Sequence, residues 1–174
     1  MQRFLLLITL GLLAGCNIVI TPSPTQQLRV LSANYATNFR TADGTSVICD
    51  NRATTLLYQF RYEGQLSSWT SYLEGQTLGE RKGQRTFTPD SQEVSDFGEQ
   101  GYEVQYVMSP NFAPYENGAE IGDDALTPQA INVVPVPQPT PIGATKLYLT
   151  LEGAGAGDDA QFDSPDIPVI INCP

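Results

Sequence analysis

Three cysteines, at positions 16, 49 and 173, carry the most versatile chemistry in this 174-residue sequence. A cysteine thiol can take a covalent modification, form a disulfide or bind a metal ion. Metal binding is the least favoured of the three, because the chain has no histidine and no Cys-x-x-Cys spacing. Zinc, haem and iron–sulfur centres are therefore not expected. The sequence predicts neither a cofactor nor a metal site.

Nucleophilic catalysis lacks its usual base in this chain. Without histidine, the Ser–His and Cys–His arrangements of hydrolases are excluded. A Ser–Lys pair would have to use Lys82, which we place in a turn, or Lys146, which we place at a strand start; both are expected to be solvated charges. The 19 acidic residues could supply the paired carboxylates of a small hydrolase, but so many acids make chance pairs plentiful. We predict that the protein is not an enzyme.

Two acidic stretches, residues 116–124 and 158–166, contain the carboxylate oxygens that Ca²⁺ prefers. Neither has the ligand spacing of an EF-hand loop, and prolines and glycines scatter the acids. Solvated loop charge is the favoured interpretation, and Ca²⁺ binding is the alternative. The glycine-rich run 153–159 lacks the Gly-Lys-Ser/Thr ending of a phosphate-binding loop and is better explained as a hairpin connection.

Four aromatic residues, Trp69, Tyr72, Phe112 and Tyr115, could form a ligand surface. Aromatic rings stack on sugar rings or cover an apolar patch of a partner. The favoured alternative is structural: Trp69 belongs to the core, and Phe112 and Tyr115 hold down a long insertion.

The first 15 residues have the composition of an export signal. Met1-Gln2-Arg3 gives a short positive start, and the apolar run Phe4–Ala14 follows. A membrane-spanning helix needs about 20 apolar residues, and this run is much shorter. Residues 16–27 carry no charge and contain two prolines, so they cannot extend the run. They are expected to form a short tether to a domain that begins at residue 28.

Leu13-Ala14-Gly15-Cys16 closes the export signal, and this motif resembles the lipobox of bacterial lipoproteins. The resemblance implies that a diacylglyceryl group is attached to the Cys16 thiol and that residues 1–15 are removed as a signal peptide. It also implies an extracytoplasmic location in the cell envelope, with the membrane as partner through the lipid anchor. Asn17 stands at the position that lipoprotein sorting reads, which points to the outer membrane if the host has two membranes.

Cys49 and Cys173 are the two cysteines left after Cys16 is assigned to lipid. An even pair in an exported chain is the situation in which disulfides form and persist. We therefore predict a Cys49–Cys173 disulfide that links two strands through the core. Two buried free thiols are the alternative.

The net charge of −10 limits the possible partners. An acidic surface repels phosphates, so nucleic acid and anionic lipid head groups are not expected to bind. Contact with a membrane would have to come from acyl chains rather than from a basic patch.

Short segments rich in β-branched and aromatic residues, separated by turn signals, indicate an all-β fold. Residues 54–62 alternate clearly, Glu63-Gly64 is a turn signal, and residues 65–73 are expected to return as the second strand of a hairpin. The expected strands are residues 28–32, 38–40, 45–49, 54–62, 65–73, 84–88, 101–108, 146–151 and 167–173.

This spacing predicts a single antiparallel β-sandwich over residues 28–174. The cysteine and aromatic pattern is immunoglobulin-like in architecture only, since the cysteine spacing differs from that of antibody domains. Residues 110–143 are rich in proline and form an insertion, of which 133–141 should be polyproline II or an edge segment.

We expect a lipid-anchored, non-catalytic structural or binding module of a bacterial cell envelope, whose partner is an envelope protein or a glycan. The alternative is a Ca²⁺-dependent or carbohydrate-binding β-sandwich module. A small hydrolase with paired carboxylates is less favoured.

Overall fold

The computed structural model describes residues 27–114, 131–155 and 158–174. The predicted signal peptide, Cys16, Tyr115 and the acidic stretch 116–124 lie outside the described residues. Within those ranges the chain forms strands and no helix, so none of them provides a helix that could cross a membrane. The strands are β1 (Arg29–Thr37), β2 (Phe39–Thr41), β3 (Ser46–Cys49), β4 (Thr54–Glu63), β5 (Leu66–Gly75), β6 (Arg81–Phe87), β7 (Val94–Asp96), β8 (Gly101–Met108), β9 (Val134–Val136), β10 (Thr140–Gly153), β11 (Asp159–Asp163) and β12 (Ile167–Ile171).

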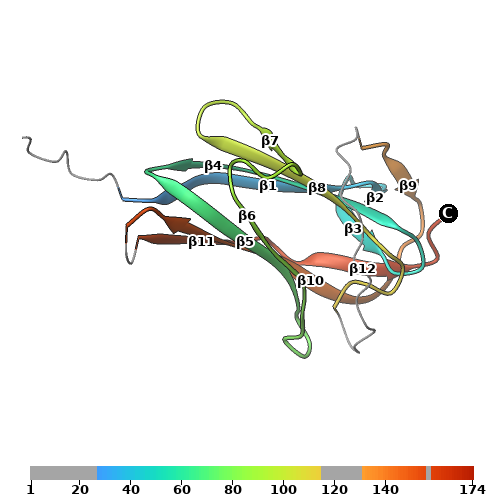
Figure 1. Cartoon of the computed structure of the whole chain (residues 1–174). Helices are drawn as coiled ribbons and strands as arrows, with labels where there is room; N and C mark the ends of the chain where they lie inside the picture. The colour runs from blue at the N-terminus through green and yellow to red at the C-terminus, as the bar shows by residue number, and fades with distance from the viewer. Residues whose placement is uncertain (1–26, 115–130, 156–157) are drawn as a thin grey trace, which may run out of the picture.

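Two sheets pack face to face, which confirms the predicted β-sandwich (Figure 1). The smaller sheet has the strand order β1-β4-β8-β7, and the larger has the order β6-β5-β10-β12-β3-β2-β9, with β11 also paired to β10. Most pairs are antiparallel, but β3–β12 and β2–β9 are parallel. The chain enters the described region at one end of the sandwich, and the C-terminus lies at the opposite end (Figure 1).

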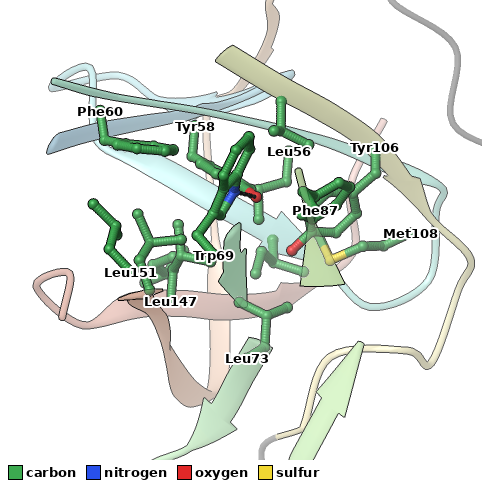
Figure 2. Close-up of a cluster of buried hydrophobic side chains, with 14 of the residues drawn as sticks. Leu56, Tyr58, Phe60, Trp69, Leu73, Phe87, Tyr106, Met108, Leu147 and Leu151 are labelled. Carbon is green, nitrogen blue, oxygen red and sulfur yellow. Dashed lines mark hydrogen bonds between the residues drawn. The ribbon is translucent and has the colours of Figure 1, made fainter. Parts of the chain in front are cut away.

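The core lies between the sheets because strands from both layers place alternate apolar residues inward. Trp69 of β5 is fully buried at its centre, and its indole Nε1 donates a hydrogen bond of 3.2 Å to the Tyr58 hydroxyl of β4. Its ring stacks on Tyr102, with centroids 5.1 Å apart, and on Phe87, at 5.6 Å. Figure 2 shows the inward side chains of the facing sheets closing around Trp69. They include Leu56, Phe60, Leu73, Leu147 and Leu151.

The predicted hairpin of residues 54–73 is wrong, although both of its strands exist. β4 belongs to the smaller sheet and β5 to the larger, so the chain arches across the core between them. Both strands place their large side chains inward, and burying those faces against each other requires strands in opposite sheets. Gly64 lies in this connection and has a φ of 107°, a positive value that glycine adopts without strain.

The first strand divides between the two sheets at Thr37 and Asn38. β1 pairs with β4 in the smaller sheet, and β2 pairs with β3 in the larger. The buried Thr37 hydroxyl lies 2.8 Å from both the Phe39 and Val47 carbonyl oxygens. The Asn38 side-chain oxygen accepts a 2.8 Å hydrogen bond from the Thr55 amide. Where the strand changes sheets, these backbone groups have no partner in a strand ladder, and the two side chains supply the missing hydrogen bonds.

A second, smaller cluster occupies one end of the larger sheet, and it contains the disulfide. Cys49 and Cys173 are bonded, as predicted, with Cα atoms 6.2 Å apart. The bond does not run through the main core: β3 and β12 are neighbours in one sheet. On β3, Ile48 faces the main core, whereas Val47 and Cys49 face the small cluster. The full small cluster is Phe39, Val47, Cys49, Val136, Ile170 and Cys173.

Three segments outside the expected strands contain short strands, and one of them is β11 in the acidic stretch 158–166, which was expected to be a loop. The acidic stretch 89–100 includes β7, at one edge of the smaller sheet. The proline-rich insertion includes β9, at one edge of the larger sheet, which agrees with the predicted edge segment. The Val134 amide donates to the Asn38 carbonyl, so alternation turns Pro135 and Pro137 toward the free edge. Proline has no amide hydrogen, and this edge therefore offers no donor at either position.

The disulfide should contribute strongly to stability, because it closes a sequence separation of 124 residues. Replacing both Cys49 and Cys173 by Ala should lower the free energy of unfolding by about 2–5 kcal/mol, measured by urea denaturation. Cys16→Ser is the control and should leave the unfolding midpoint unchanged. Non-reducing peptide mapping should give one linked pair, and free alkylation of both thiols in the native oxidised protein would contradict the assignment.

Stability should fall at alkaline pH, because burial raises the pKa of Tyr58 and Tyr106 and raises that of Tyr62 to about 12. The raised pKa values keep the folded-state phenols neutral while unfolded tyrosines ionise near pH 10. Each tyrosine therefore contributes fully to the free energy of unfolding below about pH 10, and this contribution is lost as the pH rises toward the folded-state pKa.

Urea unfolding at intervals from pH 8 to 11.5 should show this decline. Above pH 10, Tyr62→Phe should make the fall of the free energy of unfolding with pH less steep by up to about 1.4 kcal/mol per pH unit, which is the effect of one ionising group. An identical slope in the variant and the native protein would refute the role of Tyr62.

Candidate functional site

The four aromatic residues predicted as a possible ligand surface do not form one surface. Trp69 is fully buried among core rings, so it is unavailable to a ligand and has the structural role that the sequence favoured. Phe112 is half-buried and packs against the main core. A Cβ added at Gly83 of β6 would lie 3.0 Å from the Phe112 ring, so this glycine allows the ring to approach closely. Tyr115 lies outside the described residues.

Tyr72 lies on the outer face of the larger sheet, the side of β5 opposite to Trp69. Its ring stacks on Tyr148 of β10, with centroids 5.1 Å apart and planes within 9°. The Arg81 guanidinium of β6 lies 4.7 Å from the Tyr72 ring centroid and donates a 2.6 Å hydrogen bond from Nε to Glu74. That hydrogen bond raises the pKa of Arg81.

These contacts form a row across three strands, Arg81–Tyr72–Tyr148. Because β5 lies between β6 and β10, Arg81 and Tyr148 approach Tyr72 from opposite sides. Both faces of the Tyr72 ring are therefore covered, and the row presents ring edges and hydroxyl groups to solvent. Cross-strand pairs of this kind stabilise an exposed sheet face. The row can donate hydrogen bonds, but it gives a sugar ring no free face of Tyr72 on which to stack.

The sequence indicated only part of this row. Tyr148 could have been assigned to the outer face, because Leu147, Leu149 and Leu151 alternate with it. Its contact with Tyr72 needed the pairing of β5 with β10, which places the two residues directly opposite each other.

The two lysines considered for catalysis have different surroundings. Lys146 lies 3.7 Å from Asp163 and 3.8 Å from Asp166, with about a quarter of its side chain exposed. Lys82 is buried in β6, so the prediction that it is a solvated charge in a turn is wrong. A bulge between β5 and β6 adds one residue to β6 and turns Lys82 inward, opposite Leu73.

The Lys82 ammonium group has little compensation for its burial. Its side chain is 3% exposed, and its Nζ makes no hydrogen bond to any residue in the described part of the chain. The Glu80 carboxylate lies 3.9 Å away. Lys82 makes no hydrogen bond to a serine in the described part of the chain, and the partners found for Lys146 there are carboxylates.

Three of the four acids of residues 158–166 interact with groups elsewhere in the chain. Asp158 accepts a 2.8 Å hydrogen bond from the Leu28 amide, and Asp163 and Asp166 approach Lys146. Among the described residues, no group of three or more acids and cysteines is arranged to hold a metal ion. The other acidic stretch, 116–124, lies outside those residues.

Comparison with protein-family models finds no match for this chain, and comparison with curated proteins finds none either. The function therefore has to be argued from the residues and their arrangement.

The surroundings of Lys82 predict that a neutral side chain stabilises the protein. Lys82→Met keeps most of the apolar stem and removes a buried ammonium group without a hydrogen-bond partner, so the free energy of unfolding should rise by about 1–2 kcal/mol. Lys146→Met, the same change at a partly exposed lysine paired with two carboxylates, is the control and should be neutral or slightly destabilising. Urea denaturation measures both variants. A larger loss of stability in Lys82→Met than in Lys146→Met would contradict this account.

Proposed function

We propose that this protein is a lipid-anchored, non-catalytic binding or structural module of a bacterial cell envelope, held on the extracytoplasmic side. The observation that carries the proposal is the division of the three cysteines. Cys49 and Cys173 are bonded to each other, which leaves Cys16, directly after Leu13-Ala14-Gly15, for lipid. A disulfide suits an oxidising compartment outside the cytoplasm.

The place where the tether joins the domain supports this arrangement. Leu28 is buried, and its amide is held by Asp158 in the β10–β11 connection. Arg29 pairs with Glu63 at the β4–β5 arch. These contacts fix the start of β1 at one end of the sandwich, so a short tether would keep this end near the membrane and the C-terminal end away from it (Figure 1).

The charge of the chain favours acyl anchoring over electrostatic attachment. With a net charge of −10, the protein would be repelled by anionic head groups. Asn17 after the lipidated cysteine supports an outer-membrane location in a host with two membranes.

The immunoglobulin-like assignment belongs to this proposal as a matter of architecture. Two packed sheets of mainly antiparallel strands support it. The Cys49–Cys173 bond within one sheet differs from the inter-sheet bond of antibody domains. A carbohydrate-binding role is the second candidate, and the pocket described below favours it.

The lipid anchor can be tested by replacing the sulfur atom of Cys16 with oxygen. Cys16→Ser removes the thiol that would carry the diacylglyceryl group, so the protein should leave the membrane fraction or accumulate unprocessed. Fractionation and mass spectrometry of the N-terminus measure this outcome. The Cys49→Ser/Cys173→Ser variant is the matched control and should still carry lipid. An unmodified Cys16, or cleavage at another site, would refute the proposal.

A further inference from the structure

A pocket of about 470 Å³ opens at the end of the sandwich that carries the disulfide. The loop between β9 and β10, Pro137–Pro139, forms one wall, and Asn172 and Pro174, which flank Cys173, form another. Val136 links the pocket to the small cluster, and Thr140 completes the lining. The volume falls within the range of small-molecule sites.

The walls of this pocket are held in place by covalent constraints. Pro137 and Pro139 fix their own φ angles, and the disulfide holds Cys173 between Asn172 and Pro174. Asn172 has a φ of 64°, so the backbone there takes a left-handed turn. A site restrained in this way loses little conformational freedom when a ligand binds.

The polar side chains of the pocket point to a polar ligand. Gln138, Thr140 and Asn172 are exposed, and their side chains make no hydrogen bond to any of the residues that the structure describes. Two amides and one hydroxyl provide both donors and acceptors. An apolar ligand would leave these groups unpaired, which disfavours its binding.

Among the residues that the structure describes, the lining contains no acidic or basic side chain. An anionic ligand would find no counter-charge here and would be repelled by the net charge of −10. A divalent cation would find no carboxylate side chain among these described lining residues. The pocket therefore favours a neutral, polar ligand.

A peptide that extends the sheet is disfavoured at this end. Strand addition uses free backbone donors at a sheet edge, and Pro135 and Pro137 remove the donors from the outer edge of β9. A saccharide needs no such ladder, because its hydroxyl groups pair with side-chain amides and hydroxyls, and its C–H faces can lie against proline rings and Val136.

We propose that this pocket binds a neutral saccharide. The inference rests on the proposed binding role and gives that role a site and a ligand class. Asn172 and Pro174 place the pocket beside the C-terminus, which lies at the end of the sandwich opposite the start of β1 (Figure 1). An anchored protein would therefore present the pocket to glycans away from its own membrane.

The test uses the full chain, labelled with ¹⁵N, in a detergent without a sugar head group. The probes are maltotriose, cellotriose and chitotriose, followed by amide shifts in NMR. At least one of them should bind saturably at millimolar concentration and shift the amides of residues 136, 138 and 172. Trigalacturonate, which is anionic, and a neutral Gly-Ser hexapeptide should not bind. No saturable binding by the three sugars, shifts confined to other surfaces, or preference for trigalacturonate or the peptide would overturn the proposal.

Two variants test the pocket directly. Asn172→Gly removes the amide and tolerates the left-handed backbone, and Gln138→Leu removes an amide at similar size. Each should weaken binding by about fivefold or more, the loss of about one hydrogen bond. Gln161→Leu on β11 makes the same change on an exposed strand elsewhere and should keep the affinity within about twofold. Unchanged affinity in both pocket variants, with melting temperatures like that of the native protein, would refute the site.

Failure of this inference can be distinguished from failure of the anchor. If Cys16 carries no lipid but the trisaccharide binds, the location is wrong and the pocket assignment holds. If the protein is lipidated and no trisaccharide binds, the pocket assignment fails alone.

Discussion

Both layers of the sandwich depend on how the chain satisfies its polar groups where the first strand changes sheets. At Thr37 and Asn38 the backbone leaves the ladder with β4 and joins β3 within two residues. The Thr37 hydroxyl and the Asn38 side-chain oxygen make hydrogen bonds that replace the ladder bonds at this point. Without these bonds, buried carbonyl and amide groups would lose their partners, each at a cost of about 1–3 kcal/mol. One continuous segment therefore ties the two sheets together and delivers β2 to the larger sheet.

The position of β2 in the larger sheet contributes to the small cluster. Phe39 of β2 and Val136 of β9 belong to the small cluster together with residues of β3 and β12, so β3 and β12 have buried side chains on both faces. Strands covered on both faces carry uninterrupted apolar runs, which is what Val47-Ile48-Cys49 and Val169-Ile170-Ile171 provide. The disulfide lies in this cluster, beside the pocket whose lining includes both neighbours of Cys173.

The sequence predicted strand positions well and strand partners poorly. Alternation located β4, β8 and β12 because each has one apolar face that must be buried. Glu63-Gly64 fits both a hairpin and an arch, so the partner of β4 depended on core packing that no local signal encodes. Lys82 was misplaced because Arg81-Lys82-Gly83 has the composition of a turn, whereas it begins β6, and a bulge between β5 and β6 then turns Lys82 inward. The pocket could not be foreseen, since it forms only when residues 137–140 and 172–174, which are separated in the sequence by β11 and β12, lie side by side.

The prolines on the outer edge of β9 matter for molecules confined to a surface. Lipid-anchored proteins share a two-dimensional space in which neighbours collide with similar orientations, and an open sheet edge would then invite one copy to continue the sheet of the next. Pro135 and Pro137 interrupt that templating at the edge near the disulfide. Under the proposed anchoring, the same residues would keep a crowded layer of these domains from forming β-linked fibres at this edge, and the adjacent side chains would stay available for another kind of contact.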